Sequence, residues 1–454
     1  MSTESMMQAG GTRLKLMIGT ALCVSFAAEA ASPIIENILP RGAQRGTSVE
    51  ITFHGQRLED AADLLFHQQG ITFEQIVSAE SNAVVCAIAI APDAPLGRHA
   101  IRLRTNSGLT NPFIFVVGAY PETREAEPNS SAGEAQSATL NTTINGVIAN
   151  EDVDYFAVDL QAGTRIAVEV EGIRLGHKLF DPKLRFFGPG GHELVSEDDT
   201  PLMRQDPTFS YVVKETGTYH VAVSEATYGG SNDFEYRLHI GTFPRPLALS
   251  PLGGAPNTPI TTRLLGDTSD QSVDVIPASF SAGTARVEIS TDQGIAPTPL
   301  PFKPSFVPTV AETEPSAENP PLVPIPGAIE GIIQQNGDAD WFAFDGIKDQ
   351  AINVQVIARE VGSPLDSVVE ILGPDGAQVL YSDDANTPDS SGRLTLPADG
   401  RYKAYIRDHL NHGGPTFAYR VEMTPIVPSL WFTPVDNEPC AVIVPKNNHA
   451  FLLL

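Results

Sequence analysis

The sequence predicts an all-β protein made of tandem β-sandwiches, in which small immunoglobulin-like units alternate with larger β blocks. Apolar residues alternate with polar ones in short runs, as at Ile166, Val168 and Val170, which is typical of strands. The 38 glycines and 37 prolines are spread along all 454 residues, as expected for many short strands joined by turns. No amphipathic helix of useful length is present, and a long internal repeat indicates duplicated domains.

The internal repeat relates a block that opens at Gly146 to one that opens at Gly331. Its landmarks recur in the same order, and a repeat of this length indicates a duplicated domain rather than a short solenoid unit. The matching pairs are Asp152-Val153-Asp154-Tyr155-Phe156 with Asp338-Ala339-Asp340-Trp341-Phe342, Gly188-Pro189 with Gly373-Pro374, Asp198-Asp199 with Asp383-Asp384, and Tyr236-Arg237 with Tyr419-Arg420. Tandem duplication is common among binding and spacer modules and rare among catalytic sites.

The N-terminus, residues 1–30, has the pattern of a signal peptide. Arg13 and Lys15 precede an apolar run, and Ala28-Glu29-Ala30 fits a cleavage site of the small-x-small type. We therefore expect export, to the cell envelope or the medium. No other apolar segment is long enough to cross a bilayer.

Five further segments follow. Residues 33–119 have short alternating strands and turn signals that suggest an immunoglobulin-like sandwich, and residues 244–308 echo this unit in abbreviated form. The larger blocks are 120–243 and 309–424. Between these units we expect linkers at Tyr120–Pro128, Phe243–Pro246 and Pro297–Pro326 that act as spacers. Residues 425–454 look like the start of a further β domain, or a tail whose last strand joins an earlier sheet.

The charge balance argues against nucleic acid as a partner. The net charge is −26, and binding a phosphate backbone needs clustered lysine and arginine. Much of the acidity is explained by a solvated surface that keeps an exported protein soluble, and some carboxylates could also bind hard cations. Once a signal peptide is removed only Cys86 and Cys440 remain, so a disulfide framework is not expected.

Acidic side chains form the best candidate site. Glu125, Glu127 and Asn129 alternate along an extended segment and therefore point the same way, and Asp152 and Asp154 form a second pair at the start of the next strand. If the segment crosses the start of that strand, five oxygen-bearing side chains converge. Calcium accepts six to eight oxygen ligands in irregular geometry, whereas crowded carboxylates without a cation repel one another. We expect a calcium site here.

The run Glu125-Ala126-Glu127-Pro128-Asn129, with Gly146 and Asp152-Val153-Asp154 after it, resembles the bacterial pre-peptidase C-terminal domain. The resemblance covers both large blocks and implies jelly-roll-like β-sandwiches of the kind found beside secreted proteases. It also implies calcium ligation by Glu125, Glu127, Asn129, Asp152 and Asp154. Residues 33–119 resemble TIG-type immunoglobulin-like domains, and the whole arrangement resembles secreted multidomain proteins of planctomycete-type bacteria.

The second block departs from this pattern. It keeps Glu312, Glu314, Asp338 and Asp340, but Ser316 takes the place of Asn129, and a local insertion shifts Asp338 by one place. Its calcium site is therefore the weaker expectation.

Other constellations favour structural roles. Adjacent residues of a strand face opposite ways, so Asp198-Asp199 and Asp383-Asp384 do not suit a glycoside hydrolase pair. Asp408, His409 and His412 fit a solvated turn better than a metal site, and His192-Glu193 lacks the second histidine of a zinc protease. Phe156 is expected in the core, while Trp341 could belong to a core or a ligand platform. No catalytic residue is predicted.

The sequence therefore predicts a secreted, non-catalytic binding or spacer protein, stabilised by calcium, whose partner is an extracellular protein, a polysaccharide or the cell envelope. The alternative is an accessory or truncated part of a secreted peptidase whose catalytic domain lies outside this chain.

Overall fold

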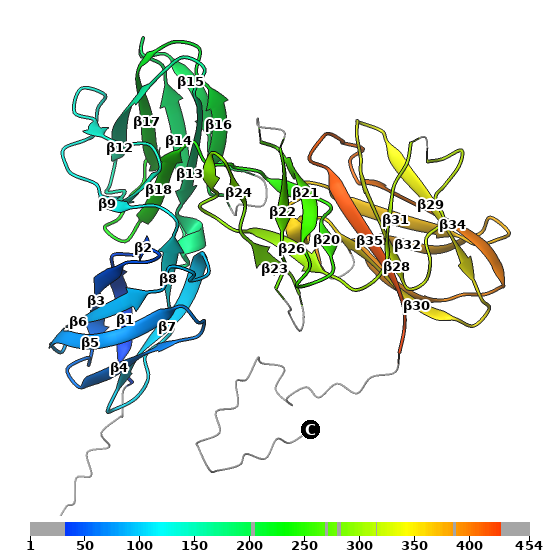
Figure 1. Ribbon diagram of the computed structural model, residues 1–454, viewed down its shortest axis with the longest axis horizontal. Coiled ribbons are helices and arrows are strands. Elements are labelled where there is room, and N and C mark those ends of the chain that lie inside the picture. The colour runs from blue at the N-terminus through cyan, green and yellow to red at the C-terminus, as the bar shows by residue number, and fades with distance from the viewer. Residues whose placement is uncertain are drawn as a thin grey trace, which may run out of the picture.

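The computed structural model describes residues 32–200, 205–267, 271–278, 283–314, 316–384 and 387–427. These residues form tandem β-sandwiches, which confirms the predicted all-β class. Following the chain, we call residues 33–119 the first small unit, 120–243 the first large block, 244–308 the second small unit and 309–424 the second large block. Figure 1 shows the first small unit below the first large block, with the second small unit leading to the second large block on the right.

The first small unit contains two four-stranded sheets, ordered β1-β3-β6-β5 and β2-β8-β7-β4. Val84, Cys86 and Ile88 on β6 are fully buried while the residues between them are partly exposed, because side chains alternate across a strand. The strands are β1 (Ile34–Leu39), β2 (Gly42–Gln44), β3 (Ser48–Gln56), β4 (Ala61–Phe66), β5 (Ile71–Ala79), β6 (Ala83–Ile90), β7 (Gly97–Thr105) and β8 (Phe113–Gly118).

The first large block contains two five-stranded sheets, ordered β10-β12-β17-β14-β15 and β16-β13-β18-β11-β9. Ile166, Val168 and Val170 are fully buried between them, as their alternation predicts. The strands are β9 (Glu122–Arg124), β10 (Gln136–Ser137), β11 (Thr142–Val147), β12 (Val153–Leu160), β13 (Arg165–Glu171), β14 (Pro182–Phe187), β15 (Glu193–Glu197), β16 (Thr208–Val212), β17 (Gly217–Glu225) and β18 (Glu235–Gly241), with a 3₁₀ turn η1 (Ile173–Leu175) after β13.

The second small unit contains shorter sheets, ordered β19-β21-β22 and β20-β26-β23, with a separate hairpin β24-β25. Its core is correspondingly small and includes Leu249, Val287 and Phe302. The strands are β19 (Ala248–Ser250), β20 (Gly253–Gly254), β21 (Ile260–Leu265), β22 (Ser272–Val275), β23 (Ala285–Val287), β24 (Ser290–Thr291), β25 (Gly294–Ile295) and β26 (Leu300–Pro304).

The second large block repeats the topology of the first, with sheets ordered β29-β34-β31-β32 and β27-β28-β35-β30-β33. The strand register is also repeated: Gly146 lies opposite Tyr236, and Gly331 lies opposite Tyr419. The strands are β27 (Thr309–Ala311), β28 (Gly327–Ile332), β29 (Ala339–Gly346), β30 (Ala351–Ile357), β31 (Ser367–Leu372), β32 (Gln378–Asp383), β33 (Ser391–Thr395), β34 (Gly400–Asp408) and β35 (Ala418–Pro425), with a 3₁₀ turn η2 (Arg359–Val361) after β30.

All three segments expected to be spacers contain strands or buried residues, and the third of them, Pro297–Pro326, includes β26 and β27. Glu122 to Arg124 form β9, which pairs in parallel with β11. Phe243 is fully buried, and Arg245 is 2% exposed and lies 2.6 Å from Glu169 across the junction of the first large block with the second small unit. These segments were expected to set the spacing between units, and their apolar and paired charged groups pack directly against the neighbouring units.

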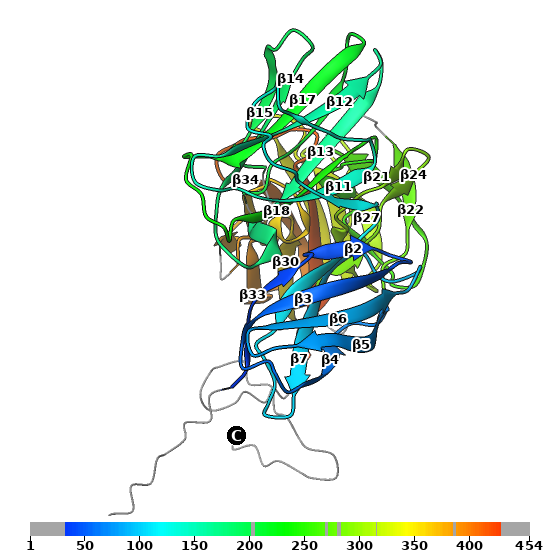
Figure 2. The same ribbon diagram turned by 90° about the vertical axis from the view of Figure 1, so that its left-hand side faces the viewer.

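The same contact docks each small unit on the large block that follows it. Arg237 is buried and lies against Gly42, where an added Cβ would come 3.0 Å from the guanidinium carbon. Arg420 is likewise buried against Gly253, where an added Cβ would come 3.0 Å from its Cδ. Each small unit thus packs against the large block that follows it, and Figure 2 shows the first small unit below the first large block.

In the part of the chain that the structure describes, no helix is long and apolar enough to span a membrane. Cys86 is a buried free thiol. The predicted signal peptide lies outside the described residues, as do Cys440 and all but the first three residues of the predicted tail.

Candidate functional site

The entry segment of the first large block crosses the start of β12, as the candidate cation site requires. The backbone N–H of Glu125 donates to the carbonyl of Asn145 at 2.9 Å, which continues the pairing of β9 with β11. The carbonyl of Asn129 then accepts from the N–H of Tyr155 at 2.8 Å. These two bonds hold the segment from 125 to 129 over the start of β12.

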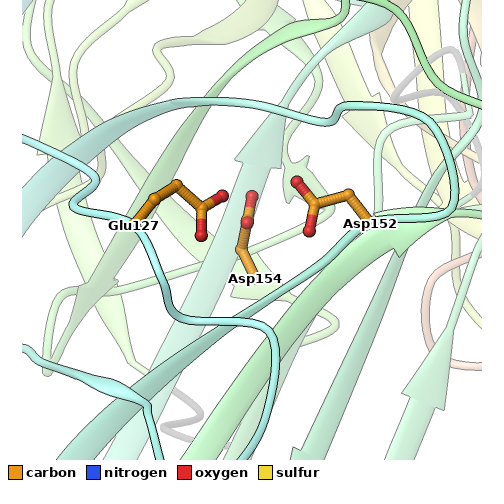
Figure 3. A group of neighbouring side chains, drawn as sticks. All are labelled: Glu127, Asp152 and Asp154. Carbon is orange, nitrogen blue, oxygen red and sulfur yellow. The ribbon is translucent and has the colours of Figure 1, made fainter.

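Three carboxylates meet at this crossing. Glu127, Asp152 and Asp154 each place a carboxylate oxygen within 4.8 Å of the other two. Figure 3 shows the side chain of Asp154 between the other two, which reach toward it from opposite sides. Asp152 is oriented by its own loop, since its Oδ1 accepts from the N–H of Val153 at 2.8 Å. Glu127 is exposed, whereas Asp154 is fully buried.

Tyr236 joins Glu125 to this cluster. Its hydroxyl lies 2.7 Å from Asp154 Oδ2 and 3.0 Å from Glu125 Oε2. The close approach depends on Gly146 opposite, because a Cβ there would lie 2.3 Å from the Tyr236 hydroxyl and 2.2 Å from Glu125 Oε2. Glu125 is also fixed by the N–H of Val147, which donates to its Oε1 at 2.7 Å.

The side chain of Asn129 completes the group. It is fully buried, and one terminal atom of its amide lies 3.0 Å from Glu127 Oε2 and 3.1 Å from Asp154 Oδ1. With the amide nitrogen on that side, Asn129 donates to both carboxylates. With the amide oxygen there, three oxygens face one another, which is an arrangement that suits a shared cation. All five residues expected from the sequence are thus brought together.

Burial strongly disfavours the charged form of the innermost carboxylate. Desolvation raises the pKa of Asp154 to about 9, and the neighbouring charge of Glu125 adds to the effect. Burial also raises the pKa of Glu125. A bound cation would remove this penalty, since an opposite charge favours ionised carboxylates.

The second large block builds a similar group from the residues at matching positions. Glu312, Glu314 and Asp340 place carboxylate oxygens within 4.8 Å of one another. Asp340 is fully buried, and the Tyr419 hydroxyl is the hydrogen-bonding group beside it. Desolvation raises the pKa of Asp340 to about 8 and that of Glu312 to about 7.

Two details distinguish the second cluster. Ser316 uses its hydroxyl to accept from the N–H of Trp341 at 2.9 Å, a role that the backbone carbonyl of Asn129 fills in the first block. Asp338 lies outside the group of three, although it accepts from the N–H of Ala339 at 2.9 Å as Asp152 does from Val153. The inserted residue before Asp338 lengthens the loop between β28 and β29 by one residue relative to the loop between β11 and β12.

The other acidic and histidine motifs lie outside any such group in the described parts of the chain. Asp198 and Asp199 are exposed. His409 pairs with Asp383 at 2.9 Å, and His412 lies 4.0 Å from Asp408, in an exposed turn. Phe156 is fully buried and Trp341 is partly exposed against Tyr405, with ring centroids 4.7 Å apart.

The tyrosines Tyr236 and Tyr419 were not predicted as part of either site. Each is fully buried on the last strand of its block. Each tyrosine lies opposite a glycine, Gly146 in the first block and Gly331 in the second. This repeated glycine–tyrosine pair is the feature of the sequence that could have indicated the role of the tyrosines.

Comparison with known proteins finds a family model that matches part of this site. Residues 152–225 match the model of the bacterial pre-peptidase C-terminal domain, which includes Asp152 and Asp154. A 66-residue stretch is 41% identical to a probable subtilase-type serine protease of Deinococcus radiodurans; the stretch is 14% of this chain and only 9% of that relative.

Three solved structures illustrate the proteins with parts similar to this chain. The pre-peptidase C-terminal domain of a Bacillus anthracis collagenase aligns over 26% of this chain and 99% of its own, at 16% identity and a TM-score of 0.20. SGBP-B of a Bacteroides ovatus mixed-linkage glucan utilization locus aligns over 46% of this chain and 53% of its own, at 12% identity and a TM-score of 0.18. The secreted serine protease VesC of Vibrio cholerae aligns over 44% of this chain and 47% of its own, at 10% identity and a TM-score of 0.17. The chain thus contains one segment, 152–225, that matches the pre-peptidase C-terminal domain model.

Proposed function

We propose that this chain is a secreted, non-catalytic binding or spacer protein whose two large blocks are each stabilised by a calcium ion. The observation that carries the proposal is the burial of Asp154 and Asp340 beside further carboxylates on an entry segment. Buried carboxylates are costly unless they are paired or coordinate a metal. The second large block is, in this proposal, a second domain of the same family, and the small units are TIG-type domains.

The donor set fits calcium better than other common cations. In the first block it consists of carboxylate and amide oxygens from Glu127, Asn129, Asp152 and Asp154, with Glu125 next to them. Hard oxygen donors in irregular array suit calcium, whereas zinc prefers histidine and cysteine. The ion would tie the entry segment to β12, and these side chains would hold it in place.

Calcium titration tests this proposal directly. We expect isothermal titration of the EDTA-treated chain to give saturable calcium binding that Asp154→Asn and Asp340→Asn each reduce. The matched control is Asp159→Asn, a substitution on the same strand as Asp154 at an exposed residue bonded to Thr218. Calcium binding that is absent from the chain, or that survives the double variant, would refute the calcium site.

The second candidate is an accessory part of a secreted peptidase. The 66-residue match to a subtilase-type protease favours it. A reading frame that joins this chain to a peptidase domain would establish that candidate, and purified chain that cleaves casein would refute the non-catalytic role.

A further inference from the structure

A cleft of about 760 Å³ lies where all four units come together. Its walls include Gln68 and Arg98 from the first small unit, Arg174 from the first large block, Arg286 from the second small unit, and Arg359 and Pro388 from the second large block. Its volume is in the range of ligand-binding pockets. It shares no residue with either carboxylate cluster.

The charge of the lining is opposite to that of the chain. Acidic residues outnumber lysine and arginine by 55 to 29 in the sequence, yet four arginines and only two glutamates line the cleft. Two of these six residues are paired inside the first large block. Arg174 lies 2.9 Å from Glu169 and 2.5 Å from Asp206, and Glu171 lies 2.6 Å from Arg237.

The remaining arginines are held at the wall. Arg98 donates from Nη1 to the carbonyl of Arg174 at 3.2 Å, and Arg286 donates from Nη1 to the carbonyl of Pro299 at 3.2 Å. Both side chains are exposed. Arg359 approaches Asp366 at 3.6 Å, and Glu360 lies 4.0 Å from Lys303.

Contacts between units fix the cleft in advance of any ligand. Glu288 accepts from Arg45 at 3.0 Å and from the N–H of Leu96 at 3.3 Å, which joins the two small units. Arg174 donates to Thr298 at 3.2 Å, which joins the first large block to the second small unit. A preformed site loses less entropy on binding than one that must be ordered.

We propose that this cleft binds an acidic peptide segment of a partner protein. Guanidinium groups bind carboxylates through paired, charge-assisted hydrogen bonds. The lining also includes apolar residues, among them Leu96, Leu300 and Pro301, which suit the side chains of a peptide. No aromatic residue is among the described residues of the lining, so the flat platform on which a sugar ring packs is missing there.

This inference rests on the proposed role as a binding protein and adds the class of its partner. The test is the fluorescence anisotropy of labelled oligoglutamate, with labelled oligoglutamine as the uncharged probe and oligogalacturonate as the acidic sugar. We expect saturable binding of oligoglutamate alone, weakened about tenfold by Arg98→Gln and by Arg286→Gln. Repulsion by the acidic surface elsewhere reduces non-specific binding of this probe.

The matched control is Arg104→Gln, which lies on the same strand as Arg98 and pairs with Asp63 at the surface at 3.3 Å. It should leave the affinity unchanged, and melting curves of all three variants should match that of the parent chain. Absence of saturable binding, equal affinity in the cleft variants, or tighter binding of oligogalacturonate would overturn the proposal. Calcium titration of the same samples keeps this outcome separate from the calcium site.

Discussion

Replacing Asp154 by asparagine should have opposite effects on stability with and without calcium. Asparagine has the shape of a protonated aspartate and carries no charge. Because burial raises the pKa of Asp154 to about 9, the calcium-free chain at pH 8 holds a proton there that the unfolded chain releases. The variant avoids this uptake of a proton, so in EDTA we expect it to be about 1–3 kcal/mol more stable.

Calcium should reverse the order. At a concentration about 100 times its dissociation constant, an ion that binds only the folded state contributes about 2.7 kcal/mol. Asp154→Asn removes the most buried charged ligand, and with it most of this contribution. The side chain also keeps its neighbour Tyr236, whose hydroxyl lies 2.7 Å from Asp154 Oδ2, so the loss is one of charge rather than of packing.

Scanning calorimetry of the parent and variant chains, each in EDTA and in excess calcium, measures both effects. A difference of 1 kcal/mol corresponds to roughly 3–6 °C for a block of this size. Asp159→Asn serves as the control and should shift with calcium as the parent does. An equal calcium shift in Asp154→Asn and the parent would show that the carboxylates of this crossing do not hold the ion.

Three further outcomes are expected. In EDTA, the free energy of unfolding should fall as pH rises from 5 to about 9. Burial raises the folded-state pKa of Asp340 to about 8 and that of Asp154 to about 9, so the folded chain binds protons in this range that the unfolded chain has released. Urea denaturation at several pH values measures the trend, and a flat or rising free energy would contradict the prediction. Gly146→Ala should displace the Tyr236 hydroxyl, cost about 1–3 kcal/mol and weaken calcium binding, whereas Gly163→Ser at an open turn should leave the affinity for calcium unchanged in the same titration. Arg237→Ala should lower stability by about 3–5 kcal/mol in urea denaturation, because it leaves Glu122 and Glu171 buried without their partner, while Arg401→Ala, at an exposed pair with Asp345, should leave the denaturation midpoint unchanged.

Much of the fold and the composition of the first site could be predicted from the sequence. Alternation alone places Ile166, Val168 and Val170 in one core, as the structure has them. The same periodicity puts Glu125, Glu127 and Asn129 on one side of an extended segment. Their meeting with Asp154 follows only if that segment crosses the start of β12, and the sequence left this crossing as a condition.

The parts that escaped prediction depend on contacts between distant segments. Arg237 lies on a strand where an arginine ordinarily faces solvent, yet it is fully enclosed because Glu122 and Glu171 arrive from two other strands. Tyr236 lies at a position where alternation along the strand predicts a core residue. The neighbouring sequence therefore does not distinguish it from a tyrosine that serves only in the core. The cleft at the junction of the four units could not be predicted from one strand or loop, since its arginines come from separate units.

The two large blocks share an arginine at the interface with the preceding small unit, and they differ at two positions that in the first block face the following unit. Arg237 and Arg420 both hold the preceding small unit, and Asp206 and Asp389 both accept the N–H groups of the 3₁₀ turns η1 and η2. At the positions that face the following unit, however, Glu169 is matched by Gln355 and Arg174 by Glu360.

In the first block, Glu169 and Arg174 form the buried contact with the second small unit. Their replacement in the second block leaves η2 with the exposed Glu360, which lines the cleft together with Arg359. The two blocks thus share the arginine that holds the preceding small unit, although its acidic partners differ, and they also differ at two positions beside the shared cleft. The same reasoning predicts that Glu360→Arg would increase the positive charge of the cleft and tighten its hold on an acidic probe, without changing calcium affinity. Weaker binding of oligoglutamate by that variant would mean that the charge of the lining does not select the ligand.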